Sequence, residues 1–498
     1  MQLPALLSGL IDSGRTSAVP AVDVSGVGCD SRTIRRGDLF VALPGTRDDG
    51  IRFVAEAVAR GAVAVVARER IEAGVPVVVS AEPARLLGAV AARLAGDPSR
   101  ALCCVGVTGT NGKTTTTHLL EGIWKAAGAQ PGVIGTIAYR FGATERPALH
   151  TTPDAPLLQV LLGEMRAAGV GHVAMEVSSH ALAQERVHGI EFDAALFTNL
   201  TRDHLDSHGD MAAYYRAKAR LFRELLPASR KPDAVAVINA DDEAGGRLAA
   251  EARTRCVRVG RRPDAEVRIG EVTSTLAGTR GTLVMDGRPF AFESPLVGAA
   301  HVENVALAAA AAWALGVDRA AIAAGLRGTV APPGRVEQIP GPGFTVVVDY
   351  AHSPDALERL LAALRPLTAN RLVCVFGCGG DRDRGKRPLM GEAAARASDL
   401  VVLTSDNPRS ERPDAIIADI EAGVRQAGMP PLGERDNRRG YVVEPDRATA
   451  IARAIAAAEP GDVVVVAGKG HESYQIVGSE RRHLDDREEV RRILGAMR

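Results

Sequence analysis

The sequence has no long uninterrupted apolar segment, and no stretch approaches the ~18 apolar residues that a membrane-spanning helix requires. Its first residues, Met1 to Pro4, also lack the basic flank and apolar region of a secretory signal peptide. Lys+Arg and Asp+Glu are both 60, so no excess charge favours bulk attraction to nucleic acid or to a membrane surface. We therefore expect a cytoplasmic protein that holds any anionic ligand locally.

Cysteine is also scarce, and the chain has no Cys-x-x-Cys spacing of the kind found in zinc sites and redox motifs. Most of the cysteines lie inside apolar runs that are typical of strands. We expect all of them to be reduced residues of the hydrophobic core. They are Cys29, Cys103, Cys104, Cys256, Cys374 and Cys378.

The length of 498 residues indicates about three domains of ordinary size. A hydrophobic content of 46% with 24% charged residues is typical of soluble globular proteins. Two turn-rich segments, Gly96–Ser99 and Ala331–Gly334, interrupt the chain just before new apolar runs. We therefore predict three domains, at residues 1–98, 99–331 and 332–498.

Within each predicted domain, apolar runs typical of strands alternate with helical stretches, as around Gly61–Val66. Val302–Leu315 is almost entirely Ala, Leu and Val, and its length favours a buried helix over a strand. Alternation of this kind predicts an α/β fold with mainly parallel sheets covered by helices. The strand candidates are Val173–Val177, Ala194–Phe197, Ala234–Ile238, Thr345–Val348, Arg371–Phe376, Leu400–Leu403 and Val463–Val466.

A glycine-rich string, Val105–Thr115, joins the apolar run Leu102–Val107 to a helical stretch. Backbone N–H groups of such a loop, a helix N-terminus and a lysine together make a triphosphate site. Lys113 would contact the β- and γ-phosphates, and the Thr114 hydroxyl would help to hold Mg²⁺. The glycines depart from the common G-x-x-x-x-G-K-[ST] pattern, so a simple glycine turn without a ligand is the alternative.

Two further strings, Met175–His180 and Thr198–Asp206, place acidic and imidazole groups directly after apolar runs. Such donors could coordinate a hard cation that bridges ATP phosphates. Each could equally be a surface loop with satisfied polar groups. In the third predicted domain, four apolar runs end in polar or glycine strings, at the edge where open parallel sheets bind ligands. These strings are Asp349–His352, Gly377–Gly380, Ser405–Arg409 and Gly468–Glu472.

The loop variant G-x-T-G-T-N-G-K-T resembles that of the Mur ligase and folylpolyglutamate synthetase superfamily, and the resemblance extends over almost the whole chain. It implies a small α/β UDP-binding domain, a central P-loop ATPase-like parallel sheet with helices on both faces and a C-terminal Rossmann-like α/β domain. It also implies an ATP-dependent ligase that forms an amide through an acyl-phosphate. We expect the protein to be a monomer. The ATP-binding residues it implies are Gly109, Thr110, Asn111, Gly112, Lys113, Thr114, Thr115, Asn304, Arg335 and Asp349.

The same resemblance implies a magnesium site and a modified lysine. Thr114, Glu176 and His204 would take part in Mg²⁺ binding. Lys218 lies in a predicted helix, Met211–Leu226, with Asp210 as its N-cap. A lone helical lysine is usually solvated. The family instead carries a carboxylated lysine (N6-carboxylysine) in this Y-x-x-x-K context. The resemblance therefore implies that Lys218 is a carbamate that supports a second magnesium ion. It also implies that the catalytic residues are Lys113, Glu176, His204 and Lys218.

Substrate identity depends on the remaining strings. Asp406-Asn-Pro-Arg409 looks like the signature of the ligase that extends the muramoyl dipeptide with a diamino acid, with arginine as the form associated with meso-diaminopimelate. The Arg409 guanidinium can clamp the second carboxylate of diaminopimelate, which lysine lacks. A surface turn is the alternative. The diaminopimelate-binding residues implied are Arg382, Asp406, Asn407, Pro408, Arg409, Gly468 and Glu472, with Glu472 facing the distal amino group.

For the nucleotide-sugar substrate, UDP-N-acetylmuramoyl-L-Ala-D-Glu, Asp30-Ser-Arg32 resembles the family's UDP-binding motif, and Thr46–Asp48 follow in a loop that matches more loosely. The implied contacts are Ser31, Thr151, Thr152, Ser178, Gln184 and Arg186. Other enzymes remain as alternatives: the lysine-adding ligase, another Mur ligase or a folylpolyglutamate synthetase. A P-loop switch or regulatory ATPase whose third domain binds a protein is the alternative from another class.

Overall fold

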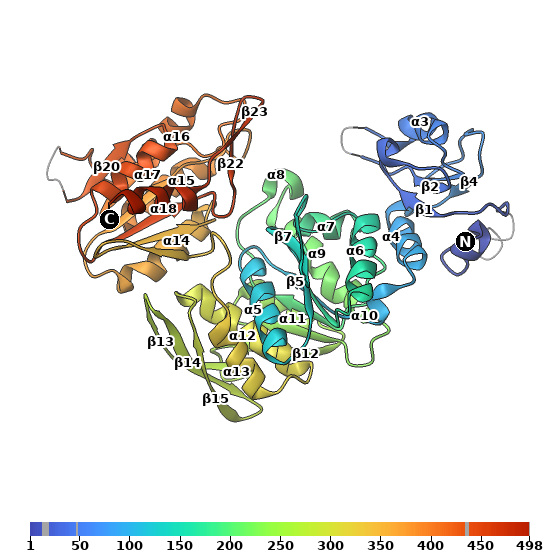
Figure 1. Ribbon diagram of the computed structural model, residues 1–498, viewed down its shortest axis with the longest axis horizontal. Coiled ribbons are helices and arrows are strands. Elements are labelled where there is room, and N and C mark those ends of the chain that lie inside the picture. The colour runs from blue at the N-terminus through green and yellow to red at the C-terminus, as the bar shows by residue number, and fades with distance from the viewer. Residues whose placement is uncertain (12–18, 46–47, 434–437, 498) are drawn as a thin grey trace.

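The computed structural model describes residues 1–11, 19–45, 48–433 and 438–497. Three α/β units follow one another along the chain, each with its own main sheet (Figure 1). The central unit lies between the other two, and its glycine-rich loop faces the C-terminal unit. This order agrees with the α/β fold that the sequence predicts.

The N-terminal unit is a four-stranded parallel sheet in the order β1-β2-β3-β4. Its longest helix, α4, starts with a proline at its first turn and buries Leu86, Leu87 and Val90 against the sheet. The elements are α1 (Leu3–Leu7), β1 (Gly26–Gly28), β2 (Asp38–Val41), α3 (Val54–Ala59), β3 (Ala64–Ala67), β4 (Val77–Val79) and α4 (Pro83–Leu94).

The central unit has an eleven-stranded sheet in the order β15-β14-β13-β12-β11-β10-β5-β9-β6-β7-β8. Its middle is parallel, from β13 to β6, whereas both ends continue as antiparallel strands. The strands are β5 (Cys103–Thr108), β6 (Pro131–Ile134), β7 (Ala138–Phe141), β8 (Thr144–Pro147), β9 (His172–Glu176), β10 (Ala194–Phe197), β11 (Val235–Asn239), β12 (Arg255–Gly260), β13 (Val267–Thr275), β14 (Gly278–Met285) and β15 (Arg288–Ser294).

Helices cover both faces of the central sheet and bury one hydrophobic core on each face. One core contains Trp124 and the mostly buried residues 301–312 of the alanine-rich helix α12, and the other contains Phe192 and Phe222. The helices are α5 (Lys113–Ala126), α6 (Ala155–Ala167), α7 (Ser179–Ala183), α8 (Leu205–His208), α9 (Met211–Arg220), the π-helical turn η4 (Leu221–Leu225), α10 (Leu226–Ala228), α11 (Glu243–Ala250), α12 (Ala299–Ala314) and α13 (Arg319–Gly328).

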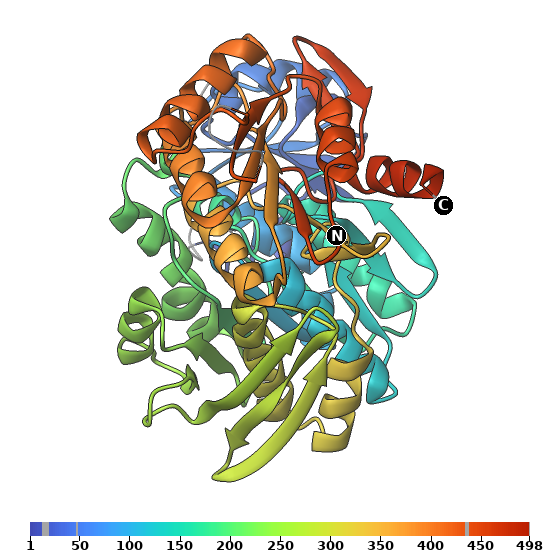
Figure 2. The same cartoon turned by 90° about the vertical axis from the view of Figure 1, so that its left-hand side faces the viewer.

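The C-terminal unit is a six-stranded sheet in the order β16-β17-β21-β18-β19-β20, parallel except for the edge strand β16. α14, α15 and α16 pack on one face, and α17 and α18 on the other (Figure 2). The elements are β16 (Glu337–Pro340), β17 (Thr345–Asp349), α14 (Pro354–Leu364), β18 (Leu372–Phe376), α15 (Lys386–Ala397), β19 (Leu400–Leu403), α16 (Pro413–Gln426), β20 (Gly440–Val443), α17 (Arg447–Ala456), β21 (Val463–Ala467), β22 (Tyr474–Val477), β23 (Glu480–His483) and α18 (Asp486–Ala496).

All seven strand candidates of the sequence form strands, with ends that differ by at most one residue. The predicted helix 211–226 is different: α9 ends at Arg220, and a π-helical turn continues it. The cysteines are all free, but Cys29, Cys103 and Cys256 are only partly buried, so the expectation of core positions is wrong for these three. In the part of the chain that the structure describes, no helix is both long and apolar enough to span a bilayer.

Candidate active site

The glycine-rich loop runs from β5 into α5, and its backbone requires glycine at two positions. Gly109 and Gly112 have φ values of 147° and 89°, in the region that favours glycine. A Cβ at Gly109 would lie 1.8 Å from Thr198 Oγ1, and one at Gly112 would lie 2.3 Å from Asn304 Oδ1. The loop is thus closely packed against its neighbours while the N-terminus of α5 points into the site.

Lys113 curls back over this loop, because its Nζ donates hydrogen bonds to the carbonyls of Gly109 at 2.9 Å and Thr110 at 2.8 Å. Burial lowers the pKa of Lys113, and Arg335 lowers it further, whereas Glu176 opposes both effects. The amine therefore stands at the mouth of an anion-binding helix terminus, where an incoming phosphate would supply the missing negative charge.

Glu176 ends β9 beside the loop and is only 1% exposed. Its Oε1 accepts from Thr114 Oγ1 at 3.0 Å and from the Thr136 N–H at 2.8 Å, and its Oε2 accepts from Thr136 Oγ1 at 3.0 Å. Thr136 was not predicted from the sequence. The available signal was its place directly after β6, at the same sheet edge as the other polar strings.

Lys218 lies on α9 and is 1% exposed, with its Nζ 2.7 Å from the Gly109 carbonyl and 4.5 Å from the centroid of the Tyr214 ring. Burial lowers its pKa well below the usual range, and the charge of Lys113 adds to the effect. The alternative of a solvated helical lysine is therefore wrong. The side chain is held under the phosphate loop instead.

Thr114 and Glu176 provide the oxygen donors that a hard cation prefers, so the residues present fit Mg²⁺ next to the loop. His204 stands in the left-handed region (φ 54°), stacks edge-on against His180 and could add a nitrogen. Burial lowers the pKa of His204 to about 4, which leaves its imidazole neutral. Lys218 fits such a set only after conversion to an anionic carbamate, because an ammonium group has no lone pair.

Three further predicted nucleotide residues come from α12 and the start of the C-terminal unit. Arg335 Nη2 is 3.4 Å from Thr114 Oγ1, and its guanidinium lies 4.4 Å from the Tyr350 ring centroid. Asp349 accepts from the N–H groups of Val336 and Ala351, both at 2.8 Å. Asn304 lies against Gly112 and accepts a 3.4 Å hydrogen bond from Thr116.

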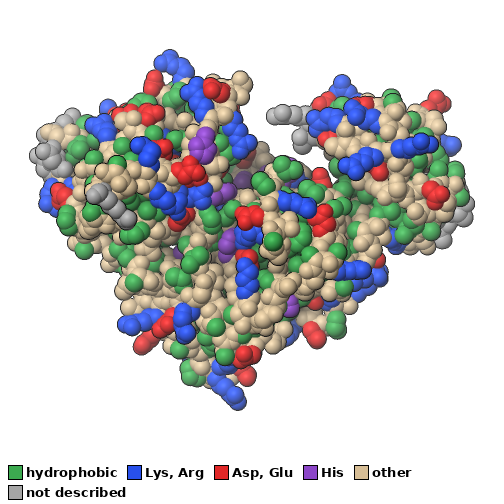
Figure 3. All heavy atoms as spheres, viewed as in Figure 1, with side chains coloured by type: hydrophobic (Ala, Val, Ile, Leu, Met, Phe, Trp, Pro, Cys, Tyr) green, Lys and Arg blue, Asp and Glu red, His purple; other side chains and the backbone are tan. Residues whose placement is uncertain are grey.

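These residues surround a cavity of about 250 Å³ between the central and C-terminal units. All the predicted nucleotide residues except Gly109 line it, together with Thr136, Glu176 and His204. A second cavity, of about 380 Å³, lies beside it. In the space-filling view, histidines gather where these two units meet (Figure 3). Asp203, His204, Tyr350 and His352 line both cavities.

The second cavity brings together the polar strings that follow β18, β19 and β21. Arg382, Asp406, Asn407, Arg409, Gly468 and Glu472 all line it. Arg409 Nη1 donates to the Gly380 carbonyl at 2.6 Å. Pro408 does not line this cavity, so the structure gives it no direct ligand contact.

Lys469 is a residue that sequence reasoning missed. It is fully buried, and its Nζ lies 3.3 Å from Glu472 Oε2 and 3.4 Å from Asn407 Oδ1. Asn407 in turn donates to Glu472 at 2.9 Å. Glu472, expected to face an amino group, therefore already has a cationic partner inside the protein.

The predicted nucleotide-sugar residues form a cluster around β9 and α7, with one exception. Arg186 donates to the Thr152 carbonyl at 2.9 Å and to Gln184 Oε1, while Thr151 and Ser178 line the first cavity. Thr152 is buried, and its hydroxyl donates to the Glu176 carbonyl. Ser31 stands apart in the N-terminal unit and donates to Glu56 at 2.8 Å, and residues 46 and 47 lie outside the described residues.

Comparison with known proteins is decisive for the family. Models of the Mur ligase family match residues 23–95 ("catalytic domain"), 107–312 ("middle domain") and 334–470 ("glutamate ligase domain"). A UDP-N-acetylmuramoyl-L-alanyl-D-glutamate--2,6-diaminopimelate ligase from Gloeobacter violaceus is 48% identical over 97% of this chain and 96% of its own length. This chain belongs to the Mur ligase family.

The likeness of this Mur ligase to solved structures extends over the whole chain. A structure named for the same diaminopimelate ligase aligns with a TM-score of 0.71 and 35% identity, covering 100% of this chain and 99% of its own. A MurF ligase from Thermotoga maritima in complex with ADP aligns with a TM-score of 0.61 over 95% of this chain and 97% of its own. At 18% identity, that second likeness concerns the fold alone.

Proposed function

We propose that this Mur ligase joins meso-diaminopimelate to UDP-N-acetylmuramoyl-L-Ala-D-Glu at the expense of ATP, through an acyl-phosphate. One observation carries the proposal: a cavity around the phosphate loop adjoins a cavity lined by Arg382 and Arg409. The ATP phosphoryl donor and the diaminopimelate amine would therefore approach the γ-carboxylate of D-Glu from two sides. Near full-length similarity to ligases of that name supports the choice of substrates.

In the first half-reaction, the γ-carboxylate of D-Glu attacks the γ-phosphate of ATP. Both groups are anionic, so the protein must neutralise charge at the phosphoryl group being transferred. Lys113, the N-terminus of α5 and Arg335 supply positive charge around this cavity. Mg²⁺, held by Thr114, Glu176, His204 and a carboxylated Lys218, would offset phosphate charge when bound. The burial of Lys218 beneath the phosphate loop supports its modification.

In the second half-reaction, the diaminopimelate amine attacks the acyl-phosphate, and the tetrahedral intermediate collapses to amide and phosphate. We assign recognition of the amino acid to Arg382, Asp406, Asn407, Arg409, Gly468 and Glu472, which line its cavity. The muramoyl dipeptide would lie near Thr151, Thr152, Ser178, Gln184 and Arg186, with the uridine nucleotide toward Ser31. We propose domain limits at residues 98/99 and 331/332, and a cytoplasmic reaction, because ATP is available there.

The test is phosphate release from ATP with Mg²⁺ and UDP-N-acetylmuramoyl-L-Ala-D-Glu, comparing meso-diaminopimelate with L-lysine as acceptor. The expected result is release with diaminopimelate alone, together with a tripeptide product identified by mass. Phosphate release with lysine alone would still support a ligase but would refute the role of Arg409. Release that no acceptor stimulates would contradict the proposal and favour an ATPase or switch.

A further inference from the structure

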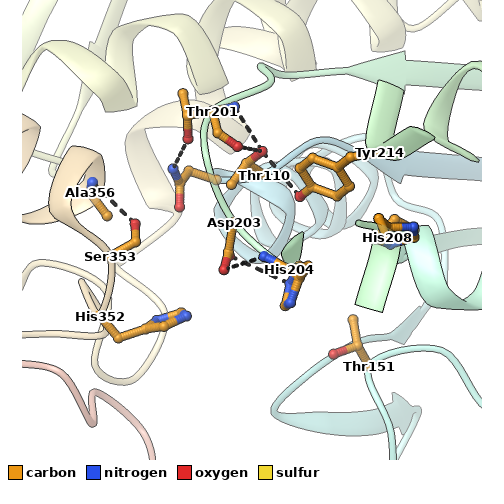
Figure 4. A network of polar contacts seen from close by, with 12 residues as sticks. Thr110, Thr151, Thr201, Asp203, His204, His208, Tyr214, His352, Ser353 and Ala356 are labelled. Atoms are coloured by element: carbon orange, nitrogen blue, oxygen red, sulfur yellow. Dashed lines mark hydrogen bonds and ion pairs between the residues drawn. The ribbon is translucent and has the colours of Figure 1, made fainter. Parts of the chain in front are cut away.

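His352 lies where the two cavities meet. It follows β17 in the C-terminal unit, whereas Asp203 and His204 come from the central unit. Figure 4 shows the imidazole of His352 pointing toward Asp203 across the space between these units. A group placed there can reach both the phosphate side and the amine side of the reaction.

The hydrogen bonds of His352 fix its tautomer. Its Nδ1 is 2.9 Å from the carbonyl oxygen of Tyr350, which can only accept, so Nδ1 carries the hydrogen. In the neutral ring, Nε2 therefore keeps a lone pair. That atom has no hydrogen bond to any residue in the described part of the chain, and the side chain is only half-buried. A free acceptor thus faces the cavities.

The charges around His352 keep it neutral but able to take up a proton. Burial lowers the pKa of His352, and Lys386, whose Nζ donates to the His352 carbonyl at 2.7 Å, lowers it further. Arg335 acts in the same direction, whereas Asp203 raises the pKa and would stabilise an imidazolium. Tyr350, whose own pKa burial raises, contacts the ring at 4.7 Å between centroids and stays uncharged.

We propose that His352 is the general base of amide formation, with Nε2 accepting the proton of the attacking amine. This inference rests on the proposed function. The amine nitrogen forms a bond to the acyl carbon and becomes positively charged in the tetrahedral intermediate. Its proton passes to Nε2, the bond from carbon to phosphate oxygen breaks with its electron pair, and phosphate leaves. The imidazolium then returns the proton to solvent, so the histidine is regenerated.

Neighbouring groups are less suited to this task. The Lys113 amine is bonded to two carbonyls, and the Lys218 amine to the Gly109 carbonyl. Burial raises the pKa of Asp203, but the nearby His352, His204 and Lys386 lower it overall, which makes this carboxylate a weak base. His352 combines access to both cavities with a free lone pair, the two geometric requirements for a base.

The experiment compares wild-type enzyme, His352→Gln and a control, His172→Gln, in the presence of ATP and Mg²⁺. His172 is a partly buried histidine of β9 that lines neither cavity. Two rates are measured. Oxygen-18 scrambling between bridge and non-bridge positions of ATP, with the muramoyl dipeptide but no acceptor, reports reversible phosphoryl transfer. Tripeptide formation with diaminopimelate, followed as a function of pH, reports the amide step.

Loss of a general base slows a reaction by ~10²- to 10⁴-fold, so His352→Gln is expected to lose tripeptide formation by that factor. Scrambling should stay within about threefold of wild type, because the attacking γ-carboxylate is already ionised and has no proton to lose. The acidic limb of the wild-type pH profile should disappear in this variant, and hydroxylamine, a far less basic nucleophile, should restore turnover. Equal loss of both rates, or retention of tripeptide formation, would overturn the assignment. Absence of both activities in the wild-type enzyme would instead refute the proposed function.

Discussion

At the scale of the residue, Arg409 shows how a specificity group is held. Its backbone lies in the left-handed region (φ 52°), its N–H donates to the Ile476 carbonyl at 3.0 Å, and its Nη1 donates to Gly380. Left-handed backbone is unfavourable for a residue with a side chain, so the surrounding contacts must maintain it. The guanidinium therefore enters the cavity from a fixed position.

Arg409→Ala is expected to raise the KM for diaminopimelate by ~10²-fold, because a carboxylate of the substrate would lose its bidentate partner. The KM for ATP should not change. Steady-state kinetics with each substrate varied separately would measure both values. Arg412→Ala is the matched control, because that arginine is 85% exposed and lines neither cavity. An unchanged diaminopimelate KM in Arg409→Ala would remove the clamp from the mechanism.

Lys469→Met is expected to lower the free energy of unfolding by about 2 kcal/mol, because the partly buried carboxylate of Glu472 loses its cationic partner. It should also raise the diaminopimelate KM, since Lys469 positions Asn407 and Glu472. Urea unfolding and steady-state kinetics would measure the two effects. Lys231→Met removes another largely buried lysine, paired with Asp193, and should affect stability alone. Equal diaminopimelate KM values in the two variants would show that Lys469 has no positioning role.

The sequence predicted which residues line the cavities better than it predicted their hydrogen-bond partners. Residues at or just after the carboxyl ends of strands, such as Glu176 and Asn407, line the cavities, because these ends of parallel strands share one edge. Thr152 and Ser31 instead direct their hydroxyls to other protein atoms. The burial of Lys469 could not be predicted, because it depends on Asn407 as well as on the nearby Glu472, and Asn407 is 62 residues away in the sequence.

At the scale of the element, α9 presents Lys218 to the phosphate loop and begins with a well-formed cap. The Asp210 side chain accepts from the Ala213 N–H at 2.7 Å. Four backbone N–H groups at a helix start lack intrahelical partners, and such a cap satisfies one of them. The cap and the helix were both predictable. The π-helical turn after Arg220 was not, because apolar periodicity alone does not distinguish it from an α-helical continuation.

Asp210→Ala is expected to lower the free energy of unfolding by about 1 kcal/mol through loss of this cap. Activity should fall as well, because fraying of α9 would loosen Lys218. Asp446→Ala removes an equivalent cap from α17, where Asp446 accepts from the Thr449 N–H at 2.8 Å, and should reduce stability without reducing activity. Urea unfolding and ligase assays would test both. Full activity in Asp210→Ala would show that the cap does not influence Lys218.

The antiparallel ends of the central sheet are elements that the sequence analysis did not predict. β13 and β14 pair in antiparallel fashion and carry buried residues such as Val267, Ile269 and Leu283 on one face only. Their alternation of apolar and polar residues is a signal for half-buried strands. The predicted strands were instead continuous apolar runs, which are typical of strands covered on both faces.

At the scale of the whole molecule, the central and C-terminal units share their ligand cavities. Arg335 enters the nucleotide cavity from the C-terminal side and reaches Thr114. A ligand that fills a cavity lined by both units must favour their closed arrangement, since only that arrangement completes its contacts.

A non-hydrolysable ATP analogue with Mg²⁺, at 100 times its Kd, is expected to stabilise the protein by about 2.7 kcal/mol. Calorimetry should show that the melting temperatures of the central and C-terminal units rise together. In Arg335→Ala, the shift should be confined to the central unit, because this link to the nucleotide is lost. If the melting temperatures of both units still rose together in the variant, at the same saturation with the ATP analogue, other contacts would couple the two units.

The shared wall of Asp203, His204, Tyr350 and His352 also restricts how this enzyme could escape an antibacterial inhibitor. A compound that fills the nucleotide cavity and rests against these four side chains would place selection pressure on them. Any substitution that displaced the compound would at the same time reshape the neighbouring cavity, which these residues also line. Resistance through this wall would therefore be accompanied by a loss of ligase activity.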